Sequence, residues 1–598
     1  MCHSYYALLN LCRLLTANSH YEVVKSMPRR VDETLLEHGR ITEATNRHSF
    51  VAYALMLDNR MEEAEKAYAR HLAISPTDAA AYFNLGNAQR EQLNPAAAAR
   101  AQQSYQSAIQ ISPAWADPYI NLGVNYRNDM VAALTAFKHA LALRPGHPHA
   151  LCNAAHASTW LANWQDRDEL MVSMRGVLER AVHEASDGTL LSAQPWHLLS
   201  YHPLPSWLPR AVASAHARAA LHAVGSQRST RNHIEPSSVR RLRIAYMSSD
   251  LDDRHPVGQL MSYVFALHDR GRFRIECYAT GPRVASRKIE LGCDRFDHVR
   301  DDDRLSDRRP MAHLLVDLNG HTEGARLDLI AARLAPVQGS AVGYPAGLGG
   351  QLVDYVHADI ASLWAVSPRP SADIAEALVL LPASFLVADH GLTFPHVRST
   401  GWAKTLRRCS LSSFSQPYKL QPDTLQAWVG IVHRLRCSLE LVQFRSASVD
   451  LLTREFSGLG ASSSGRLRWL QMLERPDHLR RASAAMLSLD TQGYNQGTSG
   501  LDALWAGLPL MTLPMRLWCS RMGASLLRAV SLPSGVSHSM RAMADMAVLL
   551  AHEPLRTFMA PRGSSRSTSV QAQHPVRRPH PISIDLLGSD VRVQDTFL

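Results

Sequence analysis

The sequence has no uninterrupted apolar run of the ~18–20 residues that a membrane-spanning helix needs. The apolar stretch near the N-terminus is broken by Asn10 and Arg13, so we expect no signal peptide and no membrane partner. The chain has eight cysteines, and they form no CxxC pair. This spacing excludes a dense disulfide framework and predicts an intracellular protein, cytoplasmic and/or nuclear, with reduced thiols and no structural zinc.

Blocks of basic residues are also missing. The net charge is +10, from 63 Lys and Arg against 53 Asp and Glu, but no run of five Lys or Arg residues occurs. Because the arginines are scattered, we expect no nucleic-acid partner. The charge remains compatible with a small ligand that carries phosphate groups. With 598 residues, 46% hydrophobic and 19% charged, the composition indicates a globular chain of roughly three to five domains.

A repeated pattern occupies the first quarter of the chain. Residues 81–87 (AYFNLGN) match residues 118–124 (PYINLGV), and a third copy runs from residue 50 to residue 76. The prolines that close the copies, at 76, 113 and 145, lie 37 and 32 residues apart, on either side of the 34-residue tetratricopeptide period. The copies resemble the tetratricopeptide family, whose stacked helix pairs form a concave groove. We therefore expect a protein or peptide partner in that groove.

Small residues fit this pattern. Gly86 and Gly123 would let the two helices of a pair approach closely, and Ala64 and Ala136 would fill the seam between helices. The middle copy carries about three extra residues near 91–97, which we expect to lengthen the turn between its two helices.

From residue 241 the pattern changes to short apolar strands that alternate with helices, which indicates parallel sheets covered on both faces. In a first unit we expect a helix near 257–267 and strands at 242–247, 273–278, 313–318, 337–342 and 377–381. In a second unit we expect strands at 439–444, 466–470, 485–489 and 510–513. The loop 490–497 leads into a helix at 498–506, where Ser499 and Asp502 have the spacing of a capping box. The start of this helix could also bind a phosphate group.

A series of motifs follows in a fixed order. They are QPWH (194–197), RLRIAY (241–246), SSD (248–250), HP (255–256), VDLNGHT (316–322), GAR (324–326), APVQ (335–338), GYP (343–345), DY (354–355), FSQPYK (414–419), HLRR (478–481), LDT (489–491), TSGLDALW (498–505) and SR (520–521). On these motifs the chain resembles the protein O-linked N-acetylglucosamine transferases and their relatives, the SPINDLY-type protein O-fucosyltransferases. The resemblance extends from the repeats to about residue 535.

The resemblance implies an α/β fold with α-helical repeats: a tetratricopeptide array followed by two Rossmann-like lobes that face each other in a GT-B arrangement. The expected domains are an N-terminal helical segment (1–46), the repeats (47–160), linking helices (161–235), an N-terminal catalytic lobe (236–400), a C-terminal nucleotide-sugar-binding lobe (401–560) and a disordered tail (561–598).

The resemblance also implies a reaction. It is the inverting, metal-independent transfer of N-acetylglucosamine from UDP-GlcNAc to Ser or Thr hydroxyls of intracellular proteins, with no cofactor beyond the donor substrate. A protein O-fucosyltransferase that uses GDP-fucose is an alternative. A catalytically inactive tetratricopeptide scaffold is another, because Gly497 stands where many relatives carry histidine and the loop from Asp250 to His255 is one residue longer than usual.

The chemistry of the donor points to particular side chains. Without a metal, fixed positive charge must stabilise the departing diphosphate, and Lys419, which follows Gln416 in the Gln-x-x-Lys pattern, is the expected cation. By resemblance, the other donor-binding residues are Gln416 of the same pattern, Thr498 and Ser499 at the diphosphate, Asp502 at the ribose hydroxyls, His478 at the base, and Arg475 at a position that is usually lysine.

Three further residues are catalytic candidates. His255 and Asp250 follow the first strand of the N-terminal lobe, where α/β sheets place their chemistry. His197 matches a family histidine that is assigned to the acceptor site or to proton transfer. The sequence leaves open whether the acceptor proton goes to a side chain or directly to a phosphate oxygen.

Overall fold

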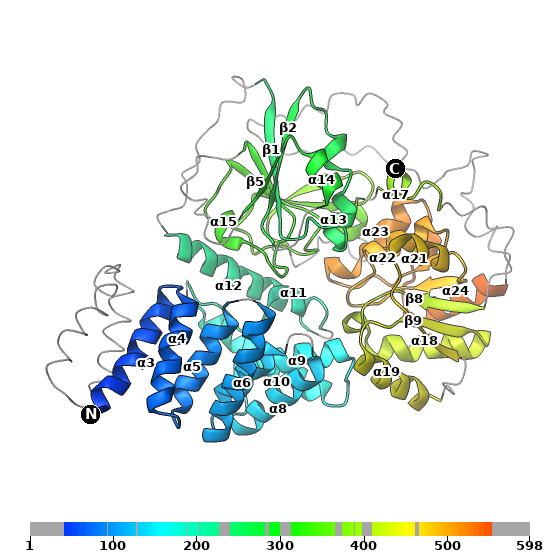
Figure 1. Ribbon diagram of the computed structural model, residues 1–598. Coiled ribbons are helices and arrows are strands. Elements are labelled where there is room, and N and C mark those ends of the chain that lie inside the picture. Colours follow the sequence, from blue (N-terminus) through cyan, green and yellow to red (C-terminus); the bar gives the residue numbers. More distant parts are fainter. Residues whose placement is uncertain are drawn as a thin grey trace.

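The structure, a computed structural model, describes residues 41–92, 94–126, 129–186, 188–201, 204–225, 240–281, 286–299, 312–364, 374–387, 389–397, 409–460 and 466–552. The expected tail (561–598) and most of the expected N-terminal segment (1–46) lie outside these residues. A helical array is followed by two lobes built on parallel sheets, which confirms the predicted fold class (Figure 1).

The array consists of helices that pack in sequence order, each against its neighbours in the chain. They are α3 (Ile41–Leu57), α4 (Met61–Ile74), α5 (Ala79–Arg90), α6 (Pro95–Ile111), α7 (Ala116–Asn125), α8 (Met130–Leu143), α9 (Pro148–Leu161) and α10 (Arg167–Glu184). A Cβ on Gly86 would lie 2.6 Å from the ring of Tyr105, and one on Gly123 would lie 2.5 Å from the ring of Phe137. These glycines therefore permit the close helix approach that the sequence predicted.

The extra residues of the middle copy lengthen a helix and not a turn. Helix α6 has 17 residues, whereas its counterparts α4 and α8 have 14 each. Residues 91–94 separate α5 from α6, as many as the residues 126–129 that separate α7 from α8. The prediction of a longer turn is wrong because Pro95, which fits the first turn of a helix, starts α6 early and the alanines after it continue the helix.

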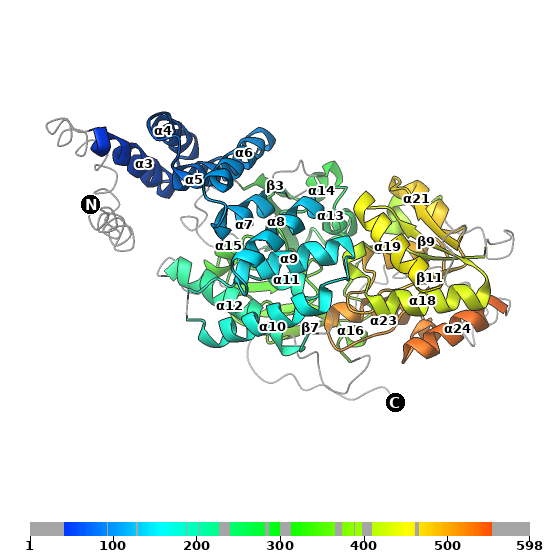
Figure 2. The same cartoon turned by 90° about the horizontal axis from the view of Figure 1, so that it is seen from below.

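The helical region contacts both lobes. Helix α12 (Trp207–Val224), which follows the short helix α11 (Pro195–Leu198), packs on α15 (Leu327–Ala331) of the N-terminal lobe. Helix α9 packs on α19 (Ser446–Gly458) of the C-terminal lobe, so the array lies beneath the N-terminal lobe and beside the C-terminal lobe (Figure 2). None of the helices in the described ranges is long and apolar enough to span a bilayer.

The N-terminal lobe has a parallel sheet of order β3-β2-β1-β4-β5-β6-β7. Its strands are β1 (Leu242–Ser248), β2 (Phe273–Ala279), β3 (Arg295–His298), β4 (Leu314–Asp317), β5 (Val337–Ser340), β6 (Tyr355–Asp359) and β7 (Ala377–Leu381). The expected strands are all present, but β3 and β6 were not predicted. The single helix predicted near 257–267 is instead a short helix, α13 (Pro256–Met261), followed by a 3₁₀ turn, η3 (Phe265–Leu267).

The C-terminal lobe has a parallel sheet of order β10-β9-β8-β11-β12. Its strands are β8 (Ser410–Ser413), β9 (Ser438–Val442), β10 (Leu467–Leu470), β11 (Leu487–Leu489) and β12 (Leu510–Met511), and helices α18 (Pro422–Leu435) and α24 (Met540–His552) pack together beside it. In both sheets the first strand lies between the second and the fourth, which is the order of a doubly wound dinucleotide-binding sheet.

The two lobes share apolar core. Leu504, Trp518 and Leu526 of the C-terminal lobe pack in the same buried cluster as Phe385 and Leu386, which follow β7. Polar contacts reinforce this junction. Ser525 donates a 2.7 Å hydrogen bond to the buried carboxylate of Asp359 at the end of β6, and Arg521 donates to the carbonyl oxygen of Leu363.

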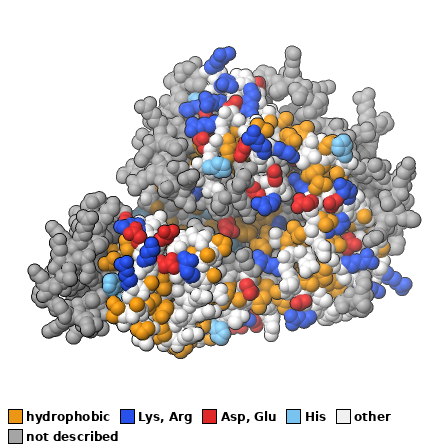
Figure 3. All heavy atoms as spheres, viewed as in Figure 1, with side chains coloured by type: hydrophobic (Ala, Val, Ile, Leu, Met, Phe, Trp, Pro, Cys, Tyr) orange, Lys and Arg blue, Asp and Glu red, His pale blue; other side chains and the backbone are white. Residues whose placement is uncertain are grey.

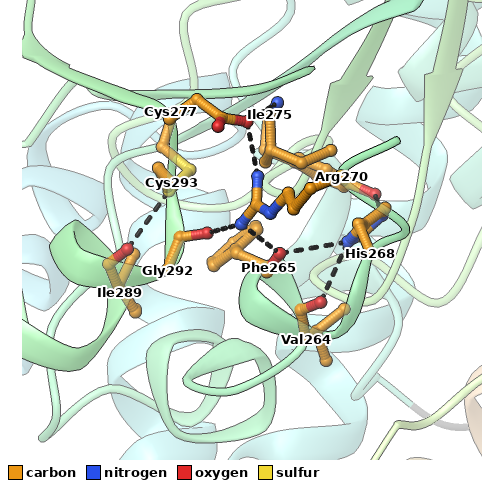
Figure 4. The surroundings of a disulfide bond; sticks show 11 residues. Val264, Phe265, His268, Arg270, Ile275, Cys277, Ile289, Gly292 and Cys293 are labelled. Carbon is orange, nitrogen blue, oxygen red and sulfur yellow. Dashed lines mark hydrogen bonds and ion pairs between the residues drawn. A yellow bond between two sulfur atoms is a disulfide. The ribbon is translucent and has the colours of Figure 1, made fainter. Parts of the chain in front are cut away.

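Four cysteines are paired, which corrects the prediction of reduced thiols. Cys277 in β2 is bonded to Cys293, which follows α14 (Arg287–Gly292), as Figure 4 shows. Cys409 before β8 is bonded to Cys437 before β9. The sequence did not reveal these pairs because each joins residues that only parallel strand pairing brings together.

Candidate functional site

The candidate site of the C-terminal lobe lies at the carboxyl ends of β8 and β11. These two strands are neighbours at the point where the strand order reverses, and ligands of open α/β sheets bind at this point. The chain after β8 forms a 3₁₀ turn, η5 (Pro417–Lys419), and the chain after β11 forms the loop 490–497 and helix α22 (Thr498–Trp505). Lys419 and the start of α22 thus come from the two strands that border the switch point.

Lys419 bonds directly to that loop. Its Nζ donates a 3.0 Å hydrogen bond to the carbonyl oxygen of Asn495 and lies 4.2 Å from the centre of the Tyr494 ring. Burial lowers the pKa of Lys419 to about 8, while the negative charge of Asp490 opposes that effect. Burial raises the pKa of Asp490 to about 7, although this carboxylate accepts hydrogen bonds from the backbone N–H of Gln496 and from Thr512. The lysine is therefore a poorly solvated cation beside the loop.

Helix α22 begins at Thr498 with Gly497 as its N-cap, and no side chain caps it. The predicted capping box is therefore wrong: Ser499 lies inside the first turn, and Asp502 bonds to side chains of other elements. The N–H groups of the first turn have no carbonyl partner within the helix, because a helix leaves its first four N–H groups without one. Thr498 and Ser499 are both half-buried, and they follow the loop to which Lys419 bonds.

Asp502 holds the second turn of α22 in a buried polar cluster. Its Oδ1 accepts hydrogen bonds from Nε and Nη2 of Arg475 at 3.1 and 2.9 Å, and Nε2 of His390 lies 2.6 Å from the same oxygen. Burial alone would raise the pKa of Asp502, but the bond from His390 and the charge of Arg475 outweigh it and hold this pKa below its ordinary value. The carboxylate is therefore ionised at neutral pH.

The other two donor-site candidates are His478 and Gln416. His478 is in α21 (Arg475–Ala482), one turn after Arg475, with its ring edge-on to Phe414 at 4.6 Å between ring centres. Burial lowers the pKa of His478, so its imidazole is neutral at pH 7. Gln416 is half-buried and begins the η5 turn that carries Lys419.

The candidate residues of the N-terminal lobe lie at the corresponding place in its sheet, after β1 and β4. Asp250 follows β1, and its Oδ2 accepts a 2.8 Å hydrogen bond from the Asn319 amide, which follows β4. His255 caps α13 by accepting from the backbone N–H of Val257, and its Nδ1 lies 3.8 Å from Asp250 Oδ2. Asp250 and His255 are therefore brought together, as the sequence predicted for neighbours of one strand end.

His197 lies on the helical side of the molecule. Its ring stacks on that of His156 from α9, with 3.6 Å between ring centres. Burial lowers the pKa of His197 well below its ordinary value, and the electrostatic effect of the neighbouring His156 lowers it further. Both rings line a cavity of about 480 Å³ together with helices α7 to α9 and residues 321–325 of the N-terminal lobe. Thr322, which lines this cavity, hydrogen-bonds to Asn319, so the cavity adjoins the Asp250 pair.

An aromatic cluster connects His197 with Lys419. Trp196 packs against both His197 and Tyr418, and Trp160 at the end of α9 packs on Tyr418 with 4.7 Å between ring centres. Tyr418 immediately precedes Lys419. The structure thus brings the QPWH and FSQPYK motifs, more than 200 residues apart, into one cluster.

The structure gathers the candidates into three groups. The donor-site candidates are together in the C-terminal lobe, Asp250 and His255 form a pair in the N-terminal lobe, and His197 lies between the helical array and both lobes. Sequence reasoning missed His390, His156 and Trp160. Nothing in their local sequence marks them, except that His390 follows an aspartate in the stretch between the lobes.

Basic side chains do not form a continuous surface patch on the face that Figure 3 shows. They lie among acidic and uncharged side chains over the described parts of the array and both lobes (Figure 3). The cation of the C-terminal site, Lys419, is half-buried, and its Nζ lies 5.9 Å and 4.2 Å from the centres of the Tyr418 and Tyr494 rings.

Comparisons with known proteins agree with this architecture. A solved mutant of an O-GlcNAc transferase from Thermobaculum terrenum aligns over 87% of this chain and 94% of its own, with a TM-score of 0.55 and 24% identity, which supports the fold. The Arabidopsis thaliana protein named probable UDP-N-acetylglucosamine–peptide N-acetylglucosaminyltransferase SEC is 29% identical over 421 residues, covering 66% of this chain and 42% of the relative. A Petunia hybrida protein named probable UDP-N-acetylglucosamine–peptide N-acetylglucosaminyltransferase SPINDLY is 26% identical over 328 residues, covering 52% of this chain and 35% of the relative.

The chain thus spans less than half the length of these curated relatives. The family described as glycosyl transferase family 41 matches residues 161–409 and 407–569, which include both lobes and the linking helices. More than half of the chain falls within these matches, and they contain all three groups of candidate residues. The chain therefore belongs to glycosyl transferase family 41.

Proposed function

We propose that this chain transfers N-acetylglucosamine from UDP-GlcNAc to Ser or Thr hydroxyls of proteins, with inversion at the sugar and without a metal. The observation that supports the proposal is that Lys419 bonds to the loop that leads into α22, the helix that carries Asp502, at the switch point of the C-terminal sheet. A cation, free N–H groups and an ionised carboxylate suit a diphosphate joined to a ribose.

The departing nucleoside diphosphate gains negative charge as the bond to the sugar breaks. The Nζ of Lys419 and the N–H groups at the start of α22 are fixed in place before the reaction, so they stabilise that charge without reorganising. In this scheme Thr498 and Ser499 bind the diphosphate, Asp502 accepts bonds from the ribose hydroxyls, and His478 packs on the base. Arg475 holds the Asp502 carboxylate through two hydrogen bonds.

The acceptor hydroxyl is proposed to enter from the cavity between the helical array and the N-terminal lobe, where His197 lies. Because the pKa of His197 is lowered by burial, its imidazole is neutral and able to accept a hydrogen bond, but it is a weak base. Proton transfer to His197 and direct transfer to a phosphate oxygen are both compatible with this arrangement. Asp250 and His255 would orient the sugar from the N-terminal lobe.

The test is transfer of label from two donors. The purified full chain is incubated with radiolabelled UDP-GlcNAc or GDP-fucose and a mixture of acceptor proteins, and incorporation is measured before and after β-elimination. We expect label to be incorporated from UDP-GlcNAc and to be released by β-elimination. Lys419→Ala should abolish this incorporation. Lys288→Ala, which removes an exposed lysine of the N-terminal lobe, should retain it.

Each contrary outcome identifies a different error. Incorporation from GDP-fucose alone would refute the proposed donor and favour the O-fucosyltransferase alternative. If calorimetry detects no binding of UDP, GDP or either sugar donor, the chain is a scaffold and the proposed activity is wrong. Cytoplasmic or nuclear location stays a prediction, to be checked by fractionation.

A further inference from the structure

Residues 389–397, which come after the last strand of the N-terminal lobe, begin with a dipeptide, Asp389-His390, whose side chains bond to opposite lobes. Asp389 Oδ2 accepts a 2.7 Å hydrogen bond from Ser262, which directly follows helix α13 in the N-terminal lobe. His390 Nε2 lies 2.6 Å from Oδ1 of Asp502 in the C-terminal lobe. Both residues are buried, with 6% and 3% of their surfaces exposed. One turn of chain therefore joins a carboxylate of the donor site to the N-terminal lobe.

The direction of the bond between His390 and Asp502 follows from the neighbouring charges. Asp502 is an acceptor, and Nη2 of Arg475 lies 3.1 Å from the same Nε2 atom of His390. An ionised carboxylate can only accept, and an unprotonated Nε2 at 2.6 Å would repel it, so Nε2 carries the proton and donates a hydrogen bond to Oδ1. Arg475 donates to that oxygen too. None of the hydrogen bonds that the described residues make with Asp502 falls on Oδ2, which is left for a ligand.

The imidazole has little freedom to move. It packs against Trp505 of α22, with 5.7 Å between ring centres, and against Phe394, with 6.1 Å. The backbone is fixed as well, because the N–H groups of Phe394 and Thr393 donate to the carbonyl oxygens of His390 and Asp389. The donor atom thus has a defined position relative to α22.

We propose that His390 is a positioning residue, which fixes the Asp502 carboxylate so that its Oδ2 meets the ribose hydroxyls of the bound nucleotide. This inference rests on the proposed function of the same site. Arg475 alone bonds to Oδ1 from one side, and the carboxylate could still rotate about its Cβ–Cγ bond. A second donor from another element removes that rotation before the nucleotide arrives, which favours binding by preorganisation.

The dipeptide also relates the donor site to the pair in the N-terminal lobe. Helix α13 begins after His255 and ends before Ser262, a length of about 9 Å for its six residues. The chain of contacts therefore runs from His255 through α13, Ser262 and the dipeptide to Asp502. The bond between Ser262 and Asp389 could stabilise the junction of the lobes by itself, so the test separates that effect from the role of His390 at the Asp502 carboxylate.

The test uses the full chain and measures UDP affinity by calorimetry. His390→Phe keeps an aromatic ring between Trp505 and Phe394 but removes the donor, and His390→Gln restores an N–H donor. We expect His390→Phe to weaken UDP binding about 10- to 100-fold, as is typical for loss of a hydrogen bond to a charged group, and His390→Gln to recover most of the affinity. Two matched controls, Ser262→Ala and replacement of the exposed His396 by alanine, should bind UDP within about twofold of the original chain.

A ligand variant separates positioning from general damage to the fold. With a UDP analogue that lacks both ribose hydroxyls, the weakening caused by His390→Phe should shrink to within about twofold, because the carboxylate then has no ribose hydroxyl to bind. A purely structural role for His390 would weaken both ligands equally. Melting temperatures of the variants are recorded beside the titrations, so that binding is compared well below unfolding.

Three results would overturn the inference. Unchanged UDP binding by His390→Phe removes the positioning role but leaves the proposed function standing. Equal weakening by Ser262→Ala assigns the effect to the lobe junction. Failure of the original chain to bind any uridine or guanosine nucleotide overturns the proposed function and the inference together.

Discussion

Substitution of Lys419 by methionine tests the electrostatic role of the site most directly. Methionine keeps the length of the buried side chain beside Tyr494 but removes the charge. Because the charge acts on the leaving diphosphate, we expect kcat/KM to fall about 10²- to 10³-fold, the range found for loss of one fixed transition-state donor. Lys288→Ala, an exposed lysine of the N-terminal lobe, is the matched control and should keep its activity.

The expected effect of this substitution on stability follows from the pKa of Lys419. The folded-state pKa, about 8, lies below the ordinary value of 10.5. The unfolded chain therefore binds this proton below about pH 10.5 and the folded chain only below about pH 8. The unfavourable term of roughly 3 kcal/mol for burying the charge is fully present at pH 7 and disappears as the pH rises from about 8 to 10.5.

Methionine removes that unfavourable term. It also removes the hydrogen bond to the carbonyl oxygen of Asn495, worth ~1 kcal/mol, and the interaction with the Tyr494 ring, worth ~1–2 kcal/mol. These terms nearly cancel, so we expect the free energy of unfolding at pH 7 to change by less than ~1 kcal/mol. Activity should be lost while stability is retained.

Two assays check this prediction. Transfer of label from UDP-GlcNAc gives kcat/KM, and urea unfolding followed by fluorescence gives the stability. In the original chain, kcat/KM should fall as the pH rises through about 8, because Lys419 loses its proton; in Lys419→Arg this alkaline fall should be absent, since arginine stays charged. Less than a tenfold loss in Lys419→Met, or a loss of activity that parallels a loss of stability, would refute the reasoning.

Three further predictions concern the helical array and the cysteines. Burial lowers the pKa of His156 to about 3 and also lowers the pKa of His197, so the unfolded chain binds more protons than the folded chain below about pH 6.5. The stability measured by thermal unfolding should therefore fall as the pH drops below 6.5. This fall should be less steep in His156→Phe. Gly123→Ala would place a Cβ 2.5 Å from an aromatic ring, and we expect it to lower the free energy of unfolding by ~1–3 kcal/mol, whereas the same change at the open position Gly430 should not create a steric clash. Peptide mapping without reductant should recover a Cys277–Cys293 cross-linked peptide; its absence from freshly purified, alkylated protein would contradict the assigned pairing.

Much of the fold could be predicted from the sequence because the elements concerned carry a local signal. The apolar strands β1, β2 and β7 and the glycines of the repeats are examples. Strand β8 was missed because its residues, Ser410–Ser413, are largely polar although every one of them is buried. Strand β3 was missed because it is a short, partly exposed edge strand with charged residues. Hydrophobicity marks neither kind of strand.

For the candidate site, the motifs identified residue types but not their partners. Asp502 fits a capping box with Ser499 by spacing alone, yet in the structure it bonds to Arg475 and to His390, which is 112 residues earlier in the chain. The spacing was misleading because the helix starts at Thr498, and the buried carboxylate finds stronger partners in a histidine and an arginine than in N–H groups of its own turn.

The sequence by itself determined that the chain has a helical repeat array and two α/β units, because periodicity and turn residues are local properties. It also determined which residues carry charge or hydroxyl groups near the strand ends. Only the tertiary structure decided that Lys419 bonds to the loop before α22, that His197 stacks on His156, and that one dipeptide bonds to Ser262 in one lobe and to Asp502 in the other. These relations depend on how strands from distant parts of the chain are ordered in each sheet and how the lobes pack, and no local sequence signal encodes them.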